Sequence, residues 1–132
     1  MGRRDSSDER WKALKEKVSK RDKRCRLMKI LTAQEYLILR KKAPAKLLER
    51  WDHAHVIGVG SHPHMCYNEK NVVLLNRYSH ENLDNCRNPL TGEPITREER
   101  DDWWRRIVGD TIFEELLEYA RRSENGREED QA

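Results

Sequence analysis

The stretch WDHAHVIG, residues 51–58, brings one carboxylate and two imidazoles into a run of four positions, immediately before an apolar pair. The side chains are those of Asp52, His53 and His55. β-branched residues follow, and glycine and proline punctuate the segment after them without a sustained helical period, which indicates a strand followed by a loop. His53 and His55 are two residues apart, so they share one face of an extended strand.

A second strand is expected at NVVLL, residues 71–75, because this short apolar run is typical of a buried strand. The chain continues directly into NRYSHENLDNC, residues 76–86, which can form a helix. His80 and Asp84 are four residues apart in that helix and therefore lie on one face, a spacing that suits two ligands of one metal ion. Asn71 stands at the start of the second strand. Strand, loop, strand and helix are thus predicted to bring imidazole and carboxylate groups to one point.

Helices are predicted before this segment. Ser6 or Ser7 can cap a helix that runs to about Asp22. The T-x-x-E capping box at residues 32–35 starts a second helix that ends before Pro44, and Pro44 in turn suits the first turn of a short third helix.

Two more helices are predicted after it. A second capping box, at residues 96–99, precedes a helix that Gly109 can end, and the last helix begins at Asp110. The terminal segments 1–5 and 124–132 are almost devoid of apolar side chains, so we expect them to be disordered.

The length of 132 residues suits a single domain, which we expect to be α+β and mostly helical. Its parts are a basic helical segment 7–50, the strand–strand–helix segment 51–87 and the C-terminal helices 96–123. Three widely spaced cysteines without a C-x-x-C pair indicate reduced thiols rather than a disulfide framework. The absence of a long apolar run predicts a cytoplasmic protein without a membrane partner.

Charge is distributed unevenly along the chain. Residues 1–50 hold 17 Lys and Arg against 7 Asp and Glu, whereas residues 51–132 hold 10 against 17. The N-terminal half is therefore the part expected to attract a polyanion such as a phosphate backbone. Solvated helix faces would give the same composition. The candidate phosphate contacts are Lys41, Lys42, Lys46, Arg77 and His64.

The motif order resembles the HNH endonuclease family, whose fold is the ββα-metal arrangement of a two-stranded hairpin and a helix. The resemblance covers about residues 50–86: DHAHVIG, then Asn71 in NVVLL, then HENLD, whose histidine follows Asn71 by nine positions. Upstream, KRDKRC, residues 20–25, is similar to a lead-in of phage and restriction-type members. Many relatives place cysteine pairs where this chain has NRYS, so no structural zinc is expected.

The segment DHAHVIG can be matched to the family's motif in two ways, which assign the general base and the metal ligand to different residues. If DH is the family's pair of ligand and base, Asp52 binds the metal and His53 is the general base. If AHVIG is matched to the family's histidine followed by two apolar residues, His55 is the base, and Ala54 occupies the usual ligand position. We prefer His55. Asp52 or His53 must then supply the missing ligand: His53 shares a face with His55, whereas Asp52 suits magnesium or manganese better.

The resemblance implies hydrolysis of DNA phosphodiester bonds with one divalent metal ion. A neutral imidazole can take a proton from water at cellular pH, and the metal, held by His80, Asp84 and either Asp52 or His53, would stabilise charge on the phosphate. Magnesium or manganese is favoured, and zinc or nickel is compatible with the donor set. Asn71 fixes the loop that aims the base, or contacts the metal.

The expected function is a phage-like DNA endonuclease of low sequence specificity that acts as a monomer, with DNA and, as further candidates, phage packaging or recombination proteins as partners. The alternative is a non-catalytic nucleic-acid-binding module with a structural metal site. A third interpretation is a helical adaptor that binds a protein through its acidic C-terminal helices. Each candidate residue alone also has an ordinary structural role, as a hydrogen-bonded strand histidine, a turn asparagine or an exposed ion pair.

Overall fold

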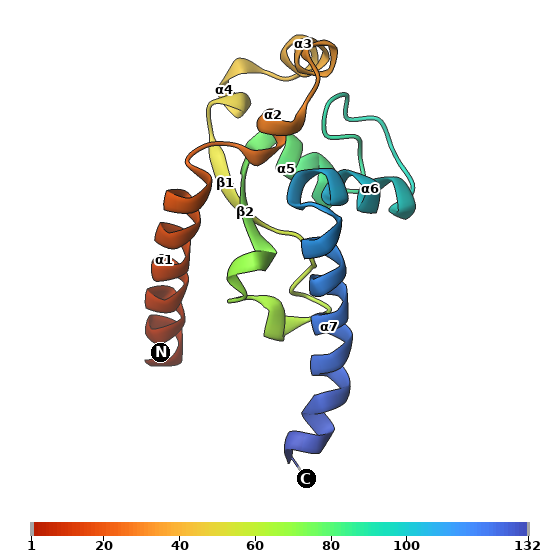
Figure 1. Cartoon of the computed structure of the whole chain (residues 1–132). Coiled ribbons are helices and arrows are strands. Elements are labelled where there is room, and N and C mark those ends of the chain that lie inside the picture. Colours follow the sequence, from red (N-terminus) through yellow and green to blue (C-terminus); the bar gives the residue numbers. More distant parts are fainter. Residues whose placement is uncertain (1, 132) are drawn as a thin grey trace.

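Helices surround a two-stranded antiparallel hairpin in the computed structural model, which describes the backbone of residues 2–131 and the side chains of residues 9–122 (Figure 1). The elements in chain order are α1 (Gly2–Asp22), α2 (Arg26–Ile30), α3 (Ala33–Lys42), α4 (Ala45–Leu48), β1 (Trp51–His55), β2 (Val72–Asn76), α5 (Arg77–Asp84), α6 (Arg97–Val108) and α7 (Asp110–Gln131). Short 3-10 turns at Pro63–Met65 and Glu69–Asn71 interrupt the loop between the strands. The α+β, mostly helical class predicted from the sequence is confirmed.

The hairpin separates two apolar clusters. Ala54 pairs with Val73 in the antiparallel register, and both belong to the main core, which is completed by side chains from α2, α3, α5, α6 and α7. Val72 and Leu74 face the opposite way and pack with Leu14 and Val18 of α1 in a second cluster. All five residues of β2 are buried, because helices cover both of its faces.

The outer edge of β2 is closed by residues 21–25, the RDKRC segment at the end of α1. Arg21 donates to the carbonyl of Val72 at 2.6 Å, and the Asp22 carboxylate accepts the backbone N–H of Leu74 at 3.0 Å. The sulfur of Cys25 accepts the backbone N–H of Asn76 at 3.2 Å. Residues 21–25 thus supply the hydrogen bonds to alternate residues of β2 that a third strand would otherwise provide. They cover an edge that could otherwise pair with another chain.

The predicted helix ends are confirmed at several positions. Thr32 and Thr96 both form complete capping boxes, with Glu35 and Glu99 respectively. Gly109 ends α6 with φ of 92°, a left-handed conformation that favours glycine. Pro44 is the N-cap of α4, one position before the first turn in which the sequence placed it.

Other expectations were wrong in their bounds. The helix expected from Ser6 or Ser7 begins earlier, at Gly2, and α2 was not foreseen, because its five residues are too few for a helical period and its N-cap, Cys25, makes no side-chain capping bond. The structure continues α1 back to Gly2 and α7 on to Gln131, since each further residue adds one backbone hydrogen bond to an existing helix. The disorder expected for the segments 1–5 and 124–132 stays a prediction. Met1 and Ala132 lie outside the described residues.

The last two helices form one side of the core. Trp104, Ile107 and Phe113 are buried there, at 3%, 2% and 1% exposure. Arg106 of α6 binds the carboxylate of Glu35 through two bonds of 2.9 and 2.8 Å, which ties α6 to the start of α3. Within residues 2–131, no helix combines the length and the apolar character needed to cross a bilayer.

Candidate functional site

The hairpin face that meets α5 carries a row of charged side chains. Asp52 Oδ2 lies 2.9 Å from Nδ1 of His80, and Nε2 of His80 lies 3.2 Å from Oδ2 of Asp84. Arg77, the first residue of α5, donates to Asp52 through Nη2 at 2.9 Å and through Nε at 3.2 Å. Asn76 caps α5 by accepting the backbone N–H of Ser79, which fixes where the helix begins and therefore where His80 lies. The i, i+4 pairing of His80 with Asp84 is confirmed.

These contacts set the protonation states of the row. The hydrogen bond with Asp84 is the largest influence on His80 and, with a second bond from Asp52, raises the pKa of His80 to about 8 against the effect of burial. For Asp52, burial is the largest single influence and would raise the pKa, but the bonds from Arg77 and His80 together hold it below its ordinary value. At neutral pH the ionised Asp52 therefore lies between two cations, Arg77 and a largely protonated His80.

The donor types in the row suit a divalent cation, since carboxylates favour magnesium or manganese and imidazole favours transition metals. They come from β1 and from successive turns of α5, and each lies within 3.2 Å of the next. However, His80 stands between the two carboxylates, and no three His, Cys, Asp or Glu side chains in the described part of the chain already surround one metal position. A cation would fit this donor set by displacing the proton of His80 and competing with Arg77 for Asp52.

The opposite face of β1 carries both strand histidines, and α1 packs over it. Nε2 of His53 lies 2.9 Å from the hydroxyl of Ser19 and 3.1 Å from the carbonyl of Lys15. Burial beneath α1 lowers the pKa of His53, and the bond to the Lys15 carbonyl offsets only part of this effect. His53 is therefore a largely neutral imidazole that fastens α1 to the hairpin.

His55, the last residue of β1, is held between an aromatic ring and a carbonyl. Its Nε2 lies 3.0 Å from the backbone oxygen of Cys66, and its ring stacks on Trp11, with centroids 5.2 Å apart and planes 18° from parallel. A carbonyl only accepts hydrogen bonds, so Nε2 carries the hydrogen. In a neutral ring the lone pair is then on Nδ1.

Asn71 fixes the loop that presents this carbonyl. Its side-chain oxygen accepts the backbone N–H of Ile57 at 2.7 Å, and its side-chain nitrogen donates to the carbonyls of Ile57 at 3.1 Å and Met65 at 3.2 Å. The side chain is fully buried. Asn71 therefore joins the start of the loop after β1 to its middle, where Cys66 follows Met65 and lies next to His55.

A cavity of about 450 Å³ lies beside this loop, lined by Arg10, Pro63, His64, Tyr67, Asn68 and Tyr119. The buried Nε2 of His64 has no hydrogen-bond partner among the described residues. The Arg10 guanidinium lies 4.2 Å from the centroid of the Tyr67 ring. Two of the lining residues, Arg10 and Tyr67, are the chain neighbours of Trp11 and Cys66, the residues that hold His55.

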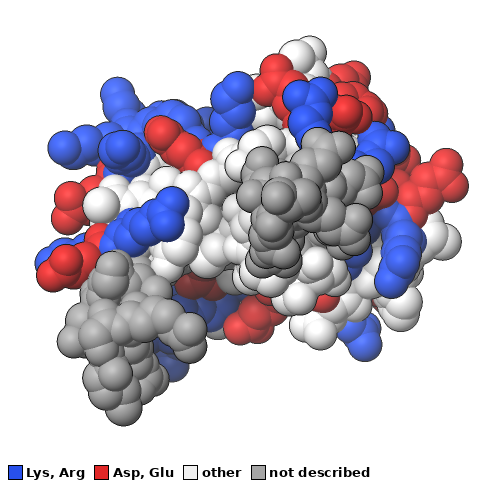
Figure 2. All heavy atoms as spheres, turned by 90° about the horizontal axis from the view of Figure 1, so that it is seen from below, with Lys and Arg blue, Asp and Glu red and all other residues white. Residues whose placement is uncertain are grey.

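The other candidate phosphate contacts lie elsewhere. Lys41 and Lys42 are exposed in the last turn of α3, and Lys46 is exposed in α4. Arg77 is paired with Asp52 rather than free. Figure 2 shows Lys and Arg side chains gathered at the upper left of this face, with Asp and Glu side chains beside them and both signs of charge intermingled on the right.

The structure thus places the site residues predicted from the sequence in two separate groups. Asp52, His80 and Asp84 come together, which makes Asp52, rather than His53, the third member of that group. His53 and His55 share one face as predicted, but it is the opposite face, because side chains alternate along a strand and these histidines lie an odd number of residues from Asp52. The expected convergence at a single point is therefore wrong for the two strand histidines.

Contacts that sequence reasoning missed include Trp11 against His55 and Arg77 against Asp52. The two-residue period of the strand could have revealed the division of the histidines from Asp52. Nothing in the local sequence signals the Cys66 carbonyl, because any residue type can supply a backbone acceptor.

Comparisons with protein-family models, with curated proteins and with solved structures found no match for this chain. The candidate site therefore rests on its own geometry. That geometry is an oriented imidazole on the α1 side of the hairpin and a charged row of Arg77, Asp52, His80 and Asp84 on the α5 side.

Proposed function

We propose that this protein is a metal-dependent DNA endonuclease of the HNH type, which nicks or cuts duplex DNA with little sequence specificity. The observation that carries the proposal is the loop held by Asn71, whose Cys66 carbonyl fixes the tautomer of His55. A histidine held in this way has a free acceptor nitrogen in a defined direction. General-base catalysis needs such a group.

In this proposal His55 is the catalytic base. Its Nδ1 takes a proton from the attacking water while Nε2–H remains bonded to the Cys66 carbonyl, which steadies the imidazolium that forms. Stacking on Trp11 limits rotation of the ring. His53 is a positioning residue that fastens α1 over the hairpin.

Asp52, His80 and Asp84 would hold one divalent cation. Bound there, a cation neutralises developing charge on the phosphate and its leaving oxygen. Arg77 has two roles in this arrangement: it keeps Asp52 ionised, and its side chain, 37% exposed, can turn to a phosphate.

The substrate must reach both faces of the hairpin. Asp52 and His55 are three residues apart on β1, about 10 Å along an extended strand. The sheet has two strands, so the outer edge of β1 has no strand partner in the described part of the chain. We propose that the DNA backbone crosses this edge at the scissile phosphate, with the attacking water toward His55 and the leaving oxygen toward the charged row.

The test is a nicking assay on supercoiled plasmid with magnesium or manganese, with and without chelator. Wild-type protein should convert the plasmid to open circles only with metal. His55→Ala should lower the rate by about 10²- to 10⁴-fold, as expected for loss of a general base, while circular dichroism and DNA affinity stay unchanged. His53→Ala is the matched control and should retain far more activity.

Two results would contradict this assignment. Intact supercoiled plasmid with wild-type protein in every metal tried would exclude the nuclease. Loss of nicking in His53→Ala with full nicking in His55→Ala would transfer the role of base to His53.

The charged row favours a second candidate, a non-catalytic nucleic-acid-binding module. Arg77 and protonated His80 already neutralise Asp52 and Asp84, and Ala54 stands where the preferred register places a metal ligand. This candidate predicts DNA binding that survives His55→Ala, with no cleavage in any metal. Unfolding of the protein by chelator would identify a structural ion within that module.

A further inference from the structure

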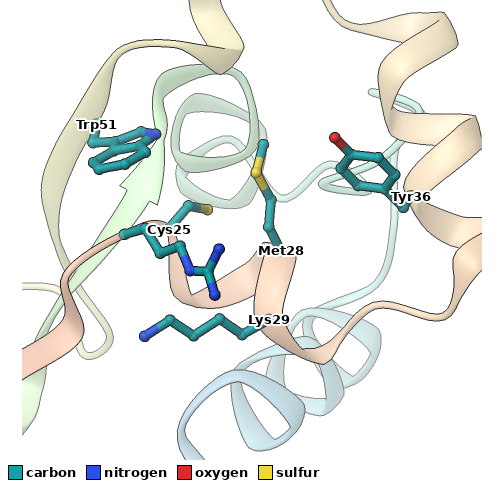
Figure 3. A pocket seen from close by; sticks show the side chains of 6 residues that line it. Cys25, Met28, Lys29, Tyr36 and Trp51 are labelled. Atoms are coloured by element: carbon teal, nitrogen blue, oxygen red, sulfur yellow. The ribbon is translucent and has the colours of Figure 1, made fainter.

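A groove separate from the hairpin site lies between α2, α3, α4 and the first residue of β1. It is formed by a cavity of about 310 Å³ lined by Arg24, Cys25, Met28, Lys29, Tyr36 and Trp51 (Figure 3). A second cavity, of about 420 Å³, shares Met28, Tyr36 and Trp51 with the first and continues along Arg40 to α4. These volumes are those of ordinary ligand sites.

Two aromatic rings flank the groove. In Figure 3, Trp51 lies on the β1 side and Tyr36 on the α3 side, with Met28 between them. Trp51 is 46% exposed and Tyr36 is 37% exposed, although only 36% of the residues in this chain are hydrophobic. Rings left open on both sides of a cavity present faces on which a planar group can stack.

The surroundings of the groove are strongly basic. Residues 23–50 contain nine Lys and Arg against two Glu, a net charge of +7. Arg24 and Lys29 line the first cavity, and Arg40 lines the second together with a single carboxylate, that of Glu49. The Arg40 guanidinium lies 5.8 Å from the centroid of the Tyr36 ring, so a cation is already placed beside one of the aromatic faces.

We propose that this groove binds a single-stranded stretch of nucleic acid, with one unstacked base held against Trp51 and Tyr36 and the adjoining phosphates on the cations of α2 and α3. Exposed aromatic faces combined with a cationic lining are the combination by which single strands are bound without sequence preference. Bases in a continuous duplex are stacked on one another and cannot enter such a groove.

This inference does not rest on the nuclease proposal. The groove shares no lining residue with the His55 side or with the charged row, and single-strand binding needs neither metal nor hydrolysis. The binding experiment is therefore made in chelator, where metal-dependent nicking cannot occur. Failure of the nuclease proposal and failure of single-strand binding are then separate outcomes.

The experiment measures fluorescence anisotropy of a labelled twelve-nucleotide oligothymidine at low salt, with a duplex of equal length as competitor. Wild-type protein should bind the single strand, and Trp51→Ala should weaken binding by about 5- to 150-fold, the range that base–aromatic stacking gives. Trp51→Phe keeps an aromatic face and should lose much less. Tyr36→Ala should weaken binding in the same direction as Trp51→Ala.

The matched control is Leu37→Ala, on the same helix as Tyr36 and 65% exposed but outside both cavities. It should leave the affinity unchanged. Circular dichroism and thermal unfolding verify that each variant is folded, and Trp51→Phe serves if Trp51→Ala is not. The proposal is overturned if wild-type protein does not bind the oligonucleotide, if Trp51→Ala and Leu37→Ala behave alike, or if the duplex displaces the single strand at equal concentration.

Discussion

At the scale of single residues, the alternation of side chains along β1 governs what the hairpin can do. Asp52 faces α5, where Arg77 and His80 bind it, whereas His55 faces α1 and the loop after β1. Ala54, between them, is fully buried in the main core and cannot supply a ligand. The candidate site therefore consists of two groups on opposite faces of β1. One is the charged row that includes Asp52, and the other is His55 with the residues that hold it.

The raised pKa of His80 makes the stability of the fold depend on pH. The protonated ring is stabilised in the folded state, with a pKa of about 8 against an ordinary value of 6.5. Its contribution, up to about 2 kcal/mol, is therefore fully present below pH 6.5 and is lost as the pH rises through about 8. Urea unfolding in chelator, at pH 6 and pH 9, should show this loss in wild-type protein and not in His80→Gln. Equal pH dependence in the two proteins would contradict the assignment.

At the scale of elements, residues 21–25 at the end of α1 cover the outer edge of β2. Arg21, Asp22 and Cys25 serve alternate positions of β2, so a helix end takes the place of a third strand. This accounts physically for the KRDKRC segment: Arg21, Asp22 and Cys25 bond to the backbone of residues 72, 74 and 76, which follow the two-residue repeat of the strand edge.

Removing one of these contacts should destabilise the protein. Asp22→Ala leaves the buried backbone N–H of Leu74 without its acceptor, and hydrogen bonds to charged groups contribute about 1.5–3 kcal/mol. We expect a decrease of that size in the free energy of unfolding, measured in urea. Asp102→Ala, at an exposed position of α6, is the control and should change it by less than about 0.5 kcal/mol. A similar small change for Asp22→Ala would mean that the edge contact contributes little.

At the scale of the whole molecule, charge is segregated between the two halves of the chain. The first 50 residues carry a net charge of +10 and the remaining 82 carry −7. A polyanion should therefore meet α1 to α4 first, and the exposed lysines of α3 and α4 extend the basic surface from the aromatic groove.

The salt dependence of DNA binding tests this segregation. Each lysine that contacts a phosphate adds about 0.7–0.9 to the slope of log affinity against log salt concentration. The double variant Lys41→Gln/Lys42→Gln should therefore reduce the slope by up to about 1.8, measured by anisotropy between 50 and 200 mM salt. The control removes two exposed cations from α7, Arg121→Gln/Arg122→Gln, and should leave the slope unchanged. Equal slopes for both double variants would place the DNA elsewhere.

The sequence by itself determined the class of the fold, the two capping boxes, the order strand, loop, strand, helix, and the pairing of His80 with Asp84. These features depend on residues close in the chain, where propensity, capping and the periods of helix and strand act directly. Tertiary structure alone decided that Asp52 completes the group with His80, that α1 covers the two strand histidines, and that Cys66, Asn71 and Trp11 hold His55. Those contacts join residues far apart in the sequence, and several use backbone carbonyls, which every residue has and which therefore leave no mark in the sequence.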